Sequence, residues 1–142
     1  MQPQINFEIK SVPEPVINFD RIKLWLIATA ESHGKSVGRL NYLFTNDEEV
    51  LKINREFLNH DYYTDIITFD YSHRDIVSGD IVISLDTVKD NSLDLCVTYD
   101  SELLRVIVHG LLHLCGIDDK GLGEREIMEQ NENIALSLWE KL

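Results

Sequence analysis

The sequence has 142 residues, of which 44% are hydrophobic and 27% are charged, a composition typical of one soluble globular domain and too apolar for a disordered chain. Its formal net charge of −12 argues against nucleic-acid binding through a broadly basic surface, because phosphate contacts need local Lys or Arg. The two cysteines, Cys96 and Cys115, form no C-x-x-C pair and predict neither a disulfide framework nor a zinc ribbon, so we expect both in the core.

The start of the chain alternates strand and helix patterns. Residues 4–9 alternate in polarity as a short strand does, and the prolines that follow cannot continue it because they lack a backbone donor. Helical spacing begins at Asp20, which we expect to be the N-cap, and ends before Gly34. Residues 38–45 then predict a second strand.

A second helix and two further strands follow. Residues 47–58 have helical spacing, with Thr45 or Asn46 as the expected N-cap and an acidic first turn that suits the helix dipole. Residues 64–71 and 79–85 are runs of β-branched and aromatic residues. We expect these two strands to pair as neighbours.

Three helical patterns fill the rest of the chain, from Leu85 to about Leu95, over residues 101–115 and over residues 124–139. Strands and helices are mixed, and no repeat or low-complexity segment interrupts them. We therefore predict an α+β fold, in which a small mixed sheet of about four strands is covered by about five helices.

Neither a membrane span nor an export signal is expected. The longest apolar run near the start, residues 24–30, is far shorter than the ~20 residues that cross a bilayer. The first residues show no basic cluster followed by an apolar stretch, as a secretory signal would. We expect one cytoplasmic domain over residues 1–142.

The helix predicted over residues 101–115 carries most of the chemistry. Its apolar residues cover nearly the whole circumference, as in a helix buried in the core, and Asp100 is the expected N-cap. The ionisable side chains of its second half are His109 and His113, four residues apart and so on one face, with Cβ atoms roughly 5–6 Å apart. A lone histidine here would indicate a hydrogen-bonded core residue, but this pair favours two ligands of one metal ion.

Two carboxylates follow the expected helix end at Gly116. Asp118 or Asp119 can fold back as a third ligand, although both also fit a solvated turn. Three protein ligands and a water make a catalytic rather than a structural zinc site, and the pKa of such a water falls to about 7.

Gly110 stands between the two histidines. Metalloproteases of the H-E-x-x-H type need a glutamate here as general base, so Gly110 excludes that class. A glycine inside a helix costs about 1 kcal/mol relative to alanine. Close approach of a backbone or substrate, or tight packing, is expected at this position.

The run HGLLHLCGIDD resembles the signature H-G-x-L-H-L-x-G-x-D-H of the YbeY family of bacterial metal-dependent endoribonucleases. Carried over residue by residue, the resemblance implies that His109 and His113 are the first two metal ligands. Asp119 occupies the place of the third histidine. A carboxylate can fill that role, and the exchange can change metal preference or affinity.

Residues 53–71 resemble a second family block, L-N-x-x-Y-R-x-K-D-x-P-T-D-V-L-S-F, and the run from residue 79 to 88 resembles the next. Leu58 stands where the family usually has an arginine that contacts RNA, and His60 stands where it has a lysine. Arg55 and His60, the neighbours of this position, are therefore candidate cations for a developing phosphate charge, although a solvated helix position is the favoured interpretation of Arg55.

The resemblance implies a small mixed sheet with helices around it and a zinc-like ion at the end of the buried central helix. It also implies hydrolysis of single-stranded RNA, in 16S rRNA 3′-end maturation and ribosome quality control, with the small ribosomal subunit as partner and no role for DNA. Two alternatives stay open. One is a metallohydrolase of another substrate, and the other is a ribosome-associated binding module with a structural metal, which an open coordination position disfavours.

Overall fold

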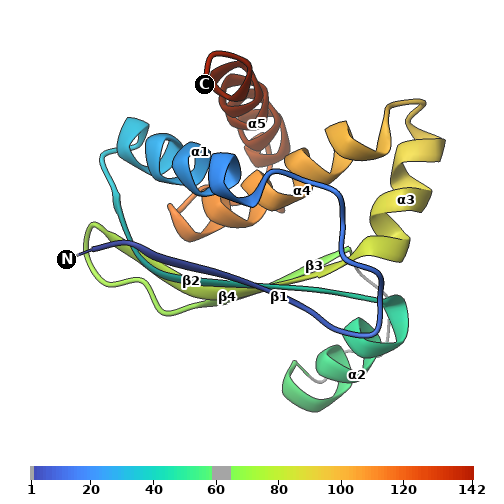
Figure 1. Cartoon of the computed structure of the whole chain (residues 1–142). Coiled ribbons are helices and arrows are strands. Elements are labelled where there is room, and N and C mark those ends of the chain that lie inside the picture. Colours follow the sequence, from blue (N-terminus) through green and yellow to red (C-terminus); the bar gives the residue numbers. More distant parts are fainter. Residues whose placement is uncertain (1, 59–64) are drawn as a thin grey trace.

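The computed structural model describes residues 2–58 and 65–142, and in this part of the chain it contains four strands and five helices (Figure 1). The strands are β1 (Gln4–Ile9), β2 (Ser36–Thr45), β3 (Ile66–Asp70) and β4 (Ile76–Ser84). The helices are α1 (Phe19–Ser32), α2 (Asp47–Phe57), α3 (Leu85–Asp94), α4 (Tyr99–Leu114) and α5 (Glu124–Glu140). The predicted α+β fold is confirmed.

The strands form one mixed sheet in the order β1-β2-β4-β3. β2 lies parallel to both β1 and β4, whereas β3 lies antiparallel to β4, with Ile66 opposite Ile83 and Asp70 opposite Gly79. The expected pairing of β3 with β4 is thus confirmed. β4 begins three residues earlier than the apolar run suggests, because Ile76 already pairs with Ser36 of β2.

The helices form unequal layers on the sheet. Figure 1 shows α1, α4 and α5 over one face and α2 on the opposite face, with α3 joining the end of β4 to α4. Under α2, a small cluster contains Val50, Ile67 and Val82, whereas the main core lies between the sheet and α4. In the described part of the chain, no helix is both long and apolar enough to cross a membrane.

Helix α4 is the centre of the main core. Leu103, Ile107 and Leu111 are fully buried, and burying each such side chain contributes roughly 1.5–3 kcal/mol. Tyr42 of β2 donates a hydrogen bond from its hydroxyl to the Ile107 carbonyl at 2.9 Å, which fixes the helix on the sheet. The end of α4 that bears the histidines is therefore a rigid platform.

Gly110 faces the sheet directly. A Cβ at this position would lie 3.0 Å from both Ile66 Cδ1 and Ile81 Cγ2. Tight packing of α4 against β3 and β4 therefore explains this glycine, without any need for substrate approach.

Two of the expected N-caps are wrong. Asn18 Oδ1 accepts from Arg21 N at 3.0 Å, so α1 is capped two residues before Asp20. Thr98 Oγ1 accepts from Ser101 N at 3.1 Å and caps α4 in place of Asp100. Both aspartates lie instead in the first turn, where their charge suits the helix dipole. For α2 the cap is Asn46, one of the two residues expected there.

The cysteines do not both lie in the core, contrary to expectation. Cys96 is exposed at the turn after α3, where its φ of 56° places it in the left-handed region. Cys115 is half-buried at the C-terminal end of α4. Cys96 misses the core because α3 ends at Asp94, and the chain must reverse before Thr98 can cap the next helix.

Candidate functional site

Helix α4 presents His109 and His113 on one face, as their spacing predicts. Buried Val108, Leu111 and Leu112 occupy the rest of the circumference and hold this end of the helix in the core. The two imidazole centroids are 6.3 Å apart, with 67° between the ring planes. The side chains are 19% and 35% exposed, so both rings can meet a ligand from solvent while their orientation is restricted.

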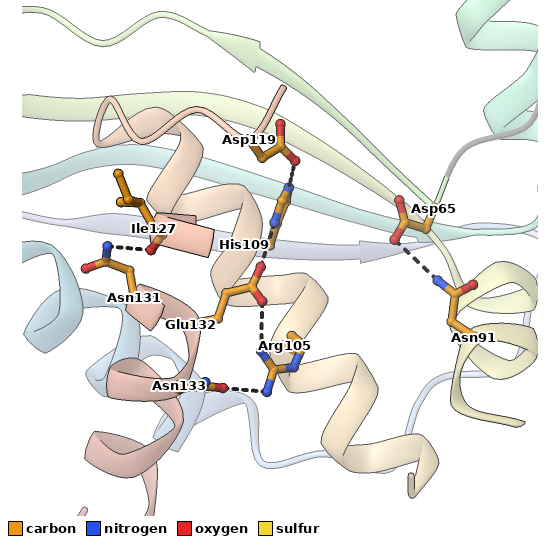
Figure 2. A network of polar contacts seen from close by, with 9 residues as sticks. All are labelled: Asp65, Asn91, Arg105, His109, Asp119, Ile127, Asn131, Glu132 and Asn133. Atoms are coloured by element: carbon orange, nitrogen blue, oxygen red, sulfur yellow. Dashed lines mark hydrogen bonds and ion pairs between the residues drawn. The ribbon is translucent and has the colours of Figure 1, made fainter. Parts of the chain in front are cut away.

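His109 lies between two carboxylates (Figure 2). Glu132 of α5 places Oε2 2.7 Å from His109 Nδ1, and Asp119 places Oδ2 3.3 Å from His109 Nε2. An ionised carboxylate can only accept a hydrogen bond, so Nδ1 carries a proton and donates to Glu132. The Nε2 edge of the ring faces Asp119.

Glu132 is itself held by a cation. Arg105, one helical turn before His109 on α4, donates from Nη1 to Glu132 Oε1 at 2.8 Å. Its Nη2 donates to Asn133 Oδ1, also at 2.8 Å. The Glu132 side chain is only 10% exposed, so this carboxylate lies largely out of water, with a partner on each oxygen.

These contacts alter the acid–base properties of both groups. Burial lowers the pKa of His109, but the hydrogen bond to Glu132 and the charges of Glu132, Asp119 and Asp65 outweigh it and raise the pKa overall. Burial raises the pKa of Glu132, but its hydrogen bonds to His109 and Arg105 outweigh that effect and lower the pKa. The pair is therefore stabilised as imidazolium and carboxylate when no other cation is present.

Sequence reasoning missed Glu132, although a signal for it exists. Met128, Glu132 and Ala135 are the buried residues of α5 and follow helical spacing. A carboxylate in the middle of an apolar stripe needs a partner in the core, because a buried charge must be paired. Glu132 lies 23 residues from His109 in sequence and outside the motif that contains the two histidines.

The histidines line a cavity of about 1160 Å³. Its wall combines α4 and α5 with the start of β3, the end of α2 and the turn after α3. Among the described residues, the charged side chains that line it are Asp65, Asp94, Glu102, Arg105, Asp119, Lys120, Arg125, Glu129 and Glu132. Acidic groups outnumber basic ones in this set, which suits the binding of a cation.

Asp65 and Glu102 are two acidic groups of this wall to which sequence reasoning gave no role. Asn91 Nδ2 donates to Asp65 Oδ2 at 3.4 Å. Burial is the main cause that raises the pKa of each carboxyl, with Arg105 opposing the shift of Glu102 and His109 opposing that of Asp65. Each side chain therefore keeps its proton to a higher pH than an ordinary carboxyl.

The two aspartates after α4 lie in different places. Asp119 is 27% exposed and faces His109, whereas Asp118 is 62% exposed, with Oδ1 3.6 Å from His113 Nδ1. Across the described residues, no three His, Cys, Asp or Glu side chains are arranged as a ready set of metal ligands. The metal-ligand roles of His109, His113 and Asp119 stay predictions.

The other candidate residues lie on α2 or outside the described residues. Arg55 is exposed on α2 and does not line the cavity. Leu58, at the C-terminal end of α2, does line it and is 37% exposed. His60 lies outside the described residues.

The fold and the cavity together define a small α+β protein in which the histidines of a buried central helix and carboxylates from the surrounding elements line one cavity. The sequence profile of the family described as Endoribonuclease YbeY matches residues 7–140. Two relatives named Endoribonuclease YbeY, from Parabacteroides distasonis and Bacteroides thetaiotaomicron, are each 51% identical over 134 residues. The matched regions cover 94% of this chain and 94% and 98% of the respective relatives.

The chain therefore belongs to the endoribonuclease YbeY family. A solution structure of a protein from Thermotoga maritima has the same fold, with a TM-score of 0.68 over 97% of this chain and 93% of that one. Its sequence is 24% identical, so this likeness concerns the fold alone.

Proposed function

We propose that this protein is a metal-dependent endoribonuclease that hydrolyses single-stranded RNA. One observation carries the proposal. In a chain of the endoribonuclease YbeY family, Glu132 engages the Nδ1 edge of His109 while the Nε2 edge faces Asp119 at the cavity wall.

The proposed ligands are His109, His113 and Asp119, and the proposed ion is zinc or another divalent transition metal. The donor set fits such an ion, because imidazole nitrogen and carboxylate oxygen both bind zinc and three protein ligands leave one position open. The contact of His109 Nδ1 with Glu132 also fits, because metal-binding histidines usually donate their other N–H to a carboxylate or carbonyl. When bound, the ion lowers the pKa of a water to about 7 and polarises a phosphate oxygen.

The cavity wall would bind and orient the RNA strand. Leu58, Leu95 and Val97 line the cavity and are 37%, 61% and 44% exposed, so they offer apolar surface to an unstacked base. Single strands expose their bases for such contacts, whereas a duplex keeps them stacked. This difference supports a preference for single-stranded RNA.

The finer assignment that we propose is 16S rRNA 3′-end maturation and ribosome quality control, in the cytoplasm, with the small ribosomal subunit as partner. Its support is the resemblance of HGLLHLCGIDD and of residues 53–71 to the blocks of the YbeY family. His60 remains a predicted phosphate contact on the same ground.

A hydrolase of a less anionic substrate is the second candidate. The acidic groups of the wall, among them Asp94, Glu102 and Glu129, favour it because they would repel a polyanion. A binding module with a purely structural ion has less support, since structural zinc normally has four protein ligands.

Metal content and RNA cleavage should be measured on the same purified protein. We expect about one bound divalent ion, cleavage of a labelled single-stranded RNA but not of its duplex, loss of cleavage with chelator, and recovery when zinc is added back. His109→Ala, purified in parallel, controls for contaminating nuclease. Cleavage that survives chelation, or a protein with neither metal nor activity on single-stranded RNA, would overturn the proposal.

A further inference from the structure

We infer that Glu132 is a positioning residue that fixes the tautomer and orientation of His109, and that Arg105 holds Glu132 in place for this task. The inference concerns residues of α4 and α5 only. The prediction of zinc affinity rests on the proposed function. The prediction of which His109 ring nitrogen carries the proton does not.

The contacts of Glu132 are specific to its two oxygens. Oε2 lies 2.7 Å from His109 Nδ1, and Oε1 lies 2.8 Å from Arg105 Nη1. Because a carboxylate only accepts, the neutral imidazole must keep its proton on Nδ1 to make this contact. The lone pair is then on Nε2, which faces Asp119 at the cavity.

Arg105 gives Glu132 a fixed position rather than only a charge partner. Its guanidinium reaches Glu132 with one nitrogen and Asn133 with the other, both at 2.8 Å, so it spans two adjacent residues of α5. Arg105 and His109 lie one turn apart on α4. Arg105 and His109, on one face of α4, therefore contact one oxygen each of the Glu132 carboxylate. The placement of α5 beside α4 thereby sets the orientation of the His109 ring.

Packing alone does not explain a carboxylate at the buried position 132. Glu132 is 10% exposed and lies between Met128 and Ala135 in the buried stripe of α5. A buried ion pair is weak support for stability, because desolvation offsets most of the attraction. An orienting role for His109 gives the charge a function that core packing does not.

The test compares Glu132→Ala and Glu132→Gln with Glu129→Ala. Glu129 lies on the same helix, is exposed and lines the same cavity, so it controls for the loss of an acidic group. NMR spectra that correlate ring nitrogens with ring protons report the His109 tautomer in the metal-free protein. Zinc affinity is measured by competition with a chelating dye.

In the wild type we expect the neutral form of His109 to carry its proton on Nδ1. Glu132→Ala should shift the proton to Nε2 and weaken zinc binding about 10–100-fold, the usual range for a lost outer-shell partner. Glu132→Gln keeps only one acceptor oxygen, for which Arg105 and His109 compete, so its zinc affinity should lie between those of the wild type and Glu132→Ala. Glu129→Ala should resemble the wild type.

A purely structural role would lower the melting temperature of Glu132→Ala without moving the tautomer or the zinc affinity measured below that temperature. That result overturns the inference. If the wild type shows the expected tautomer but binds no zinc, the proposed function fails while the orienting role of Glu132 stands, so the two failures are distinguishable.

We also propose that Lys120 and Arg125 form a phosphate-binding subsite at the wall of this cavity. A different observation carries this proposal, namely that two of the cations at the cavity form no ion pair with a described residue. Within the described part of the chain, Arg105, Lys120 and Arg125 are the Lys and Arg residues that line it. The identity of the ligand as an RNA phosphate rests on the proposed function.

The three cations differ in what they contact. Arg105 is engaged by Glu132 and Asn133, as described above. Lys120 and Arg125 are exposed and form no ion pair or side-chain hydrogen bond with any described residue. Lys120 directly follows Asp119 and lines the same cavity as His109 and His113. An anionic strand in this acidic cavity needs local cations, and these two are available.

The test is the salt dependence of RNA affinity. Lys120→Ser, Arg125→Ser and the double variant are compared with Lys141→Ser, which removes an exposed lysine at the other end of α5, about 25 Å away along the helix. Binding of a labelled single-stranded RNA is followed by anisotropy over a series of KCl concentrations, with chelator present to prevent cleavage.

Each cavity variant should bind more weakly and reduce the slope of log affinity against log salt by about 0.7, the value for one phosphate on a single strand. The double variant should lose about twice that, and Lys141→Ser should leave the slope unchanged. Equal slopes in the wild type and the double variant would overturn the subsite. If the wild type binds RNA with the expected slope but does not cleave it when zinc is supplied, the proposed function fails instead.

Discussion

Asp119 Oδ2 lies 3.3 Å from His109 Nε2, the ring nitrogen that Glu132 does not engage. Asp118, the adjacent carboxylate, is far more exposed and lies nearer His113. Asp119→Ala should therefore remove most of the bound metal, whereas Asp118→Ala, a matched control, should retain it. Asp119→His should preserve or tighten binding, because imidazole is also a good zinc ligand.

Metal analysis after equilibration with a fixed free zinc concentration checks the Asp119 prediction. Circular dichroism of each variant shows whether it is folded. Loss of metal in Asp118→Ala with retention in Asp119→Ala would show that Asp118, and not Asp119, is the third ligand.

The two histidines should be needed for metal but not for folding. His109→Ala or His113→Ala is expected to remove most bound metal while the cooperative unfolding transition persists, because Leu103, Ile107 and Leu111 hold α4 in the core. His33→Ala, at the C-terminal end of α1, is the control for the loss of an imidazole elsewhere. Metal content equal to wild type in both α4 variants would contradict a shared site.

Much of the fold could be predicted because its signals are local. Polarity patterns along the chain gave every strand and helix, and the i, i+4 spacing placed His109 and His113 on one face. The caps Asn18 and Thr98 were missed because an N-cap depends on which side-chain oxygen reaches the amide three residues on, and neighbouring aspartates look equally able in sequence.

The rest of the candidate site depends on contacts between distant segments. Glu132 is 23 residues from His109 in sequence, and the apolar stripe of α5 around Glu132 indicates a buried partner without identifying His109 as that partner. Asp65 joins the same cavity from the start of β3. Such partners follow from how α5 and the sheet are placed around α4, which periodicity along one helix cannot encode.

Leu58→Arg should raise affinity for single-stranded RNA. Leu58 lines the cavity and is 37% exposed, so an arginine there reaches water and carries no buried charge. The stability change should stay within about 0.5 kcal/mol, as for most surface substitutions. The salt slope of binding should steepen by about 0.7 for one added phosphate contact.

The control for Leu58→Arg is Leu24→Arg, the same change at an exposed leucine on α1. Melting temperature and RNA affinity are measured on both variants. A folded Leu58→Arg protein with the RNA affinity of the wild type would show that position 58 does not contact RNA here.

Gly110→Ala should destabilise the protein by about 1 kcal/mol. The added methyl would lie 3.0 Å from Ile81 Cγ2, and overpacking of a core costs roughly 1–3 kcal/mol, offset by up to about 1 kcal/mol of helix propensity. Urea unfolding measures the change. In an Ile81→Ala background the same substitution should cost less, because one of the two opposing side chains is gone, although Ile66 Cδ1 still lies 3.0 Å from the added methyl. A Gly110→Ala protein more stable than the wild type would show that the Ile66 and Ile81 side chains move aside at little cost.

Glu102 should make the folded protein less stable as the pH rises through the acid range. The residue is 6% exposed on α4, and burial raises its pKa above the ordinary value of 4.5. Arg105 and a hydrogen bond from Asn91 oppose this shift, while the charges of Asp65 and Glu132 add to it. Below about pH 4.5 the group is protonated in both the folded and the unfolded chain and adds no cost.

Above the raised pKa, Glu102 is ionised in a site that favours the neutral acid, so the folded state loses stability relative to the unfolded chain, where the carboxyl ionises freely. Glu102→Gln cannot ionise and should escape this loss. The free energy of unfolding of Glu102→Gln minus that of the wild type should therefore increase as the pH rises from below 4.5 through the raised pKa, and then level off. Urea titrations at a series of pH values measure this difference, with Glu140→Gln at the exposed end of α5 as the reference for replacing a surface carboxylate. A difference that decreases with rising pH would mean that the attraction of Arg105 outweighs the burial of Glu102.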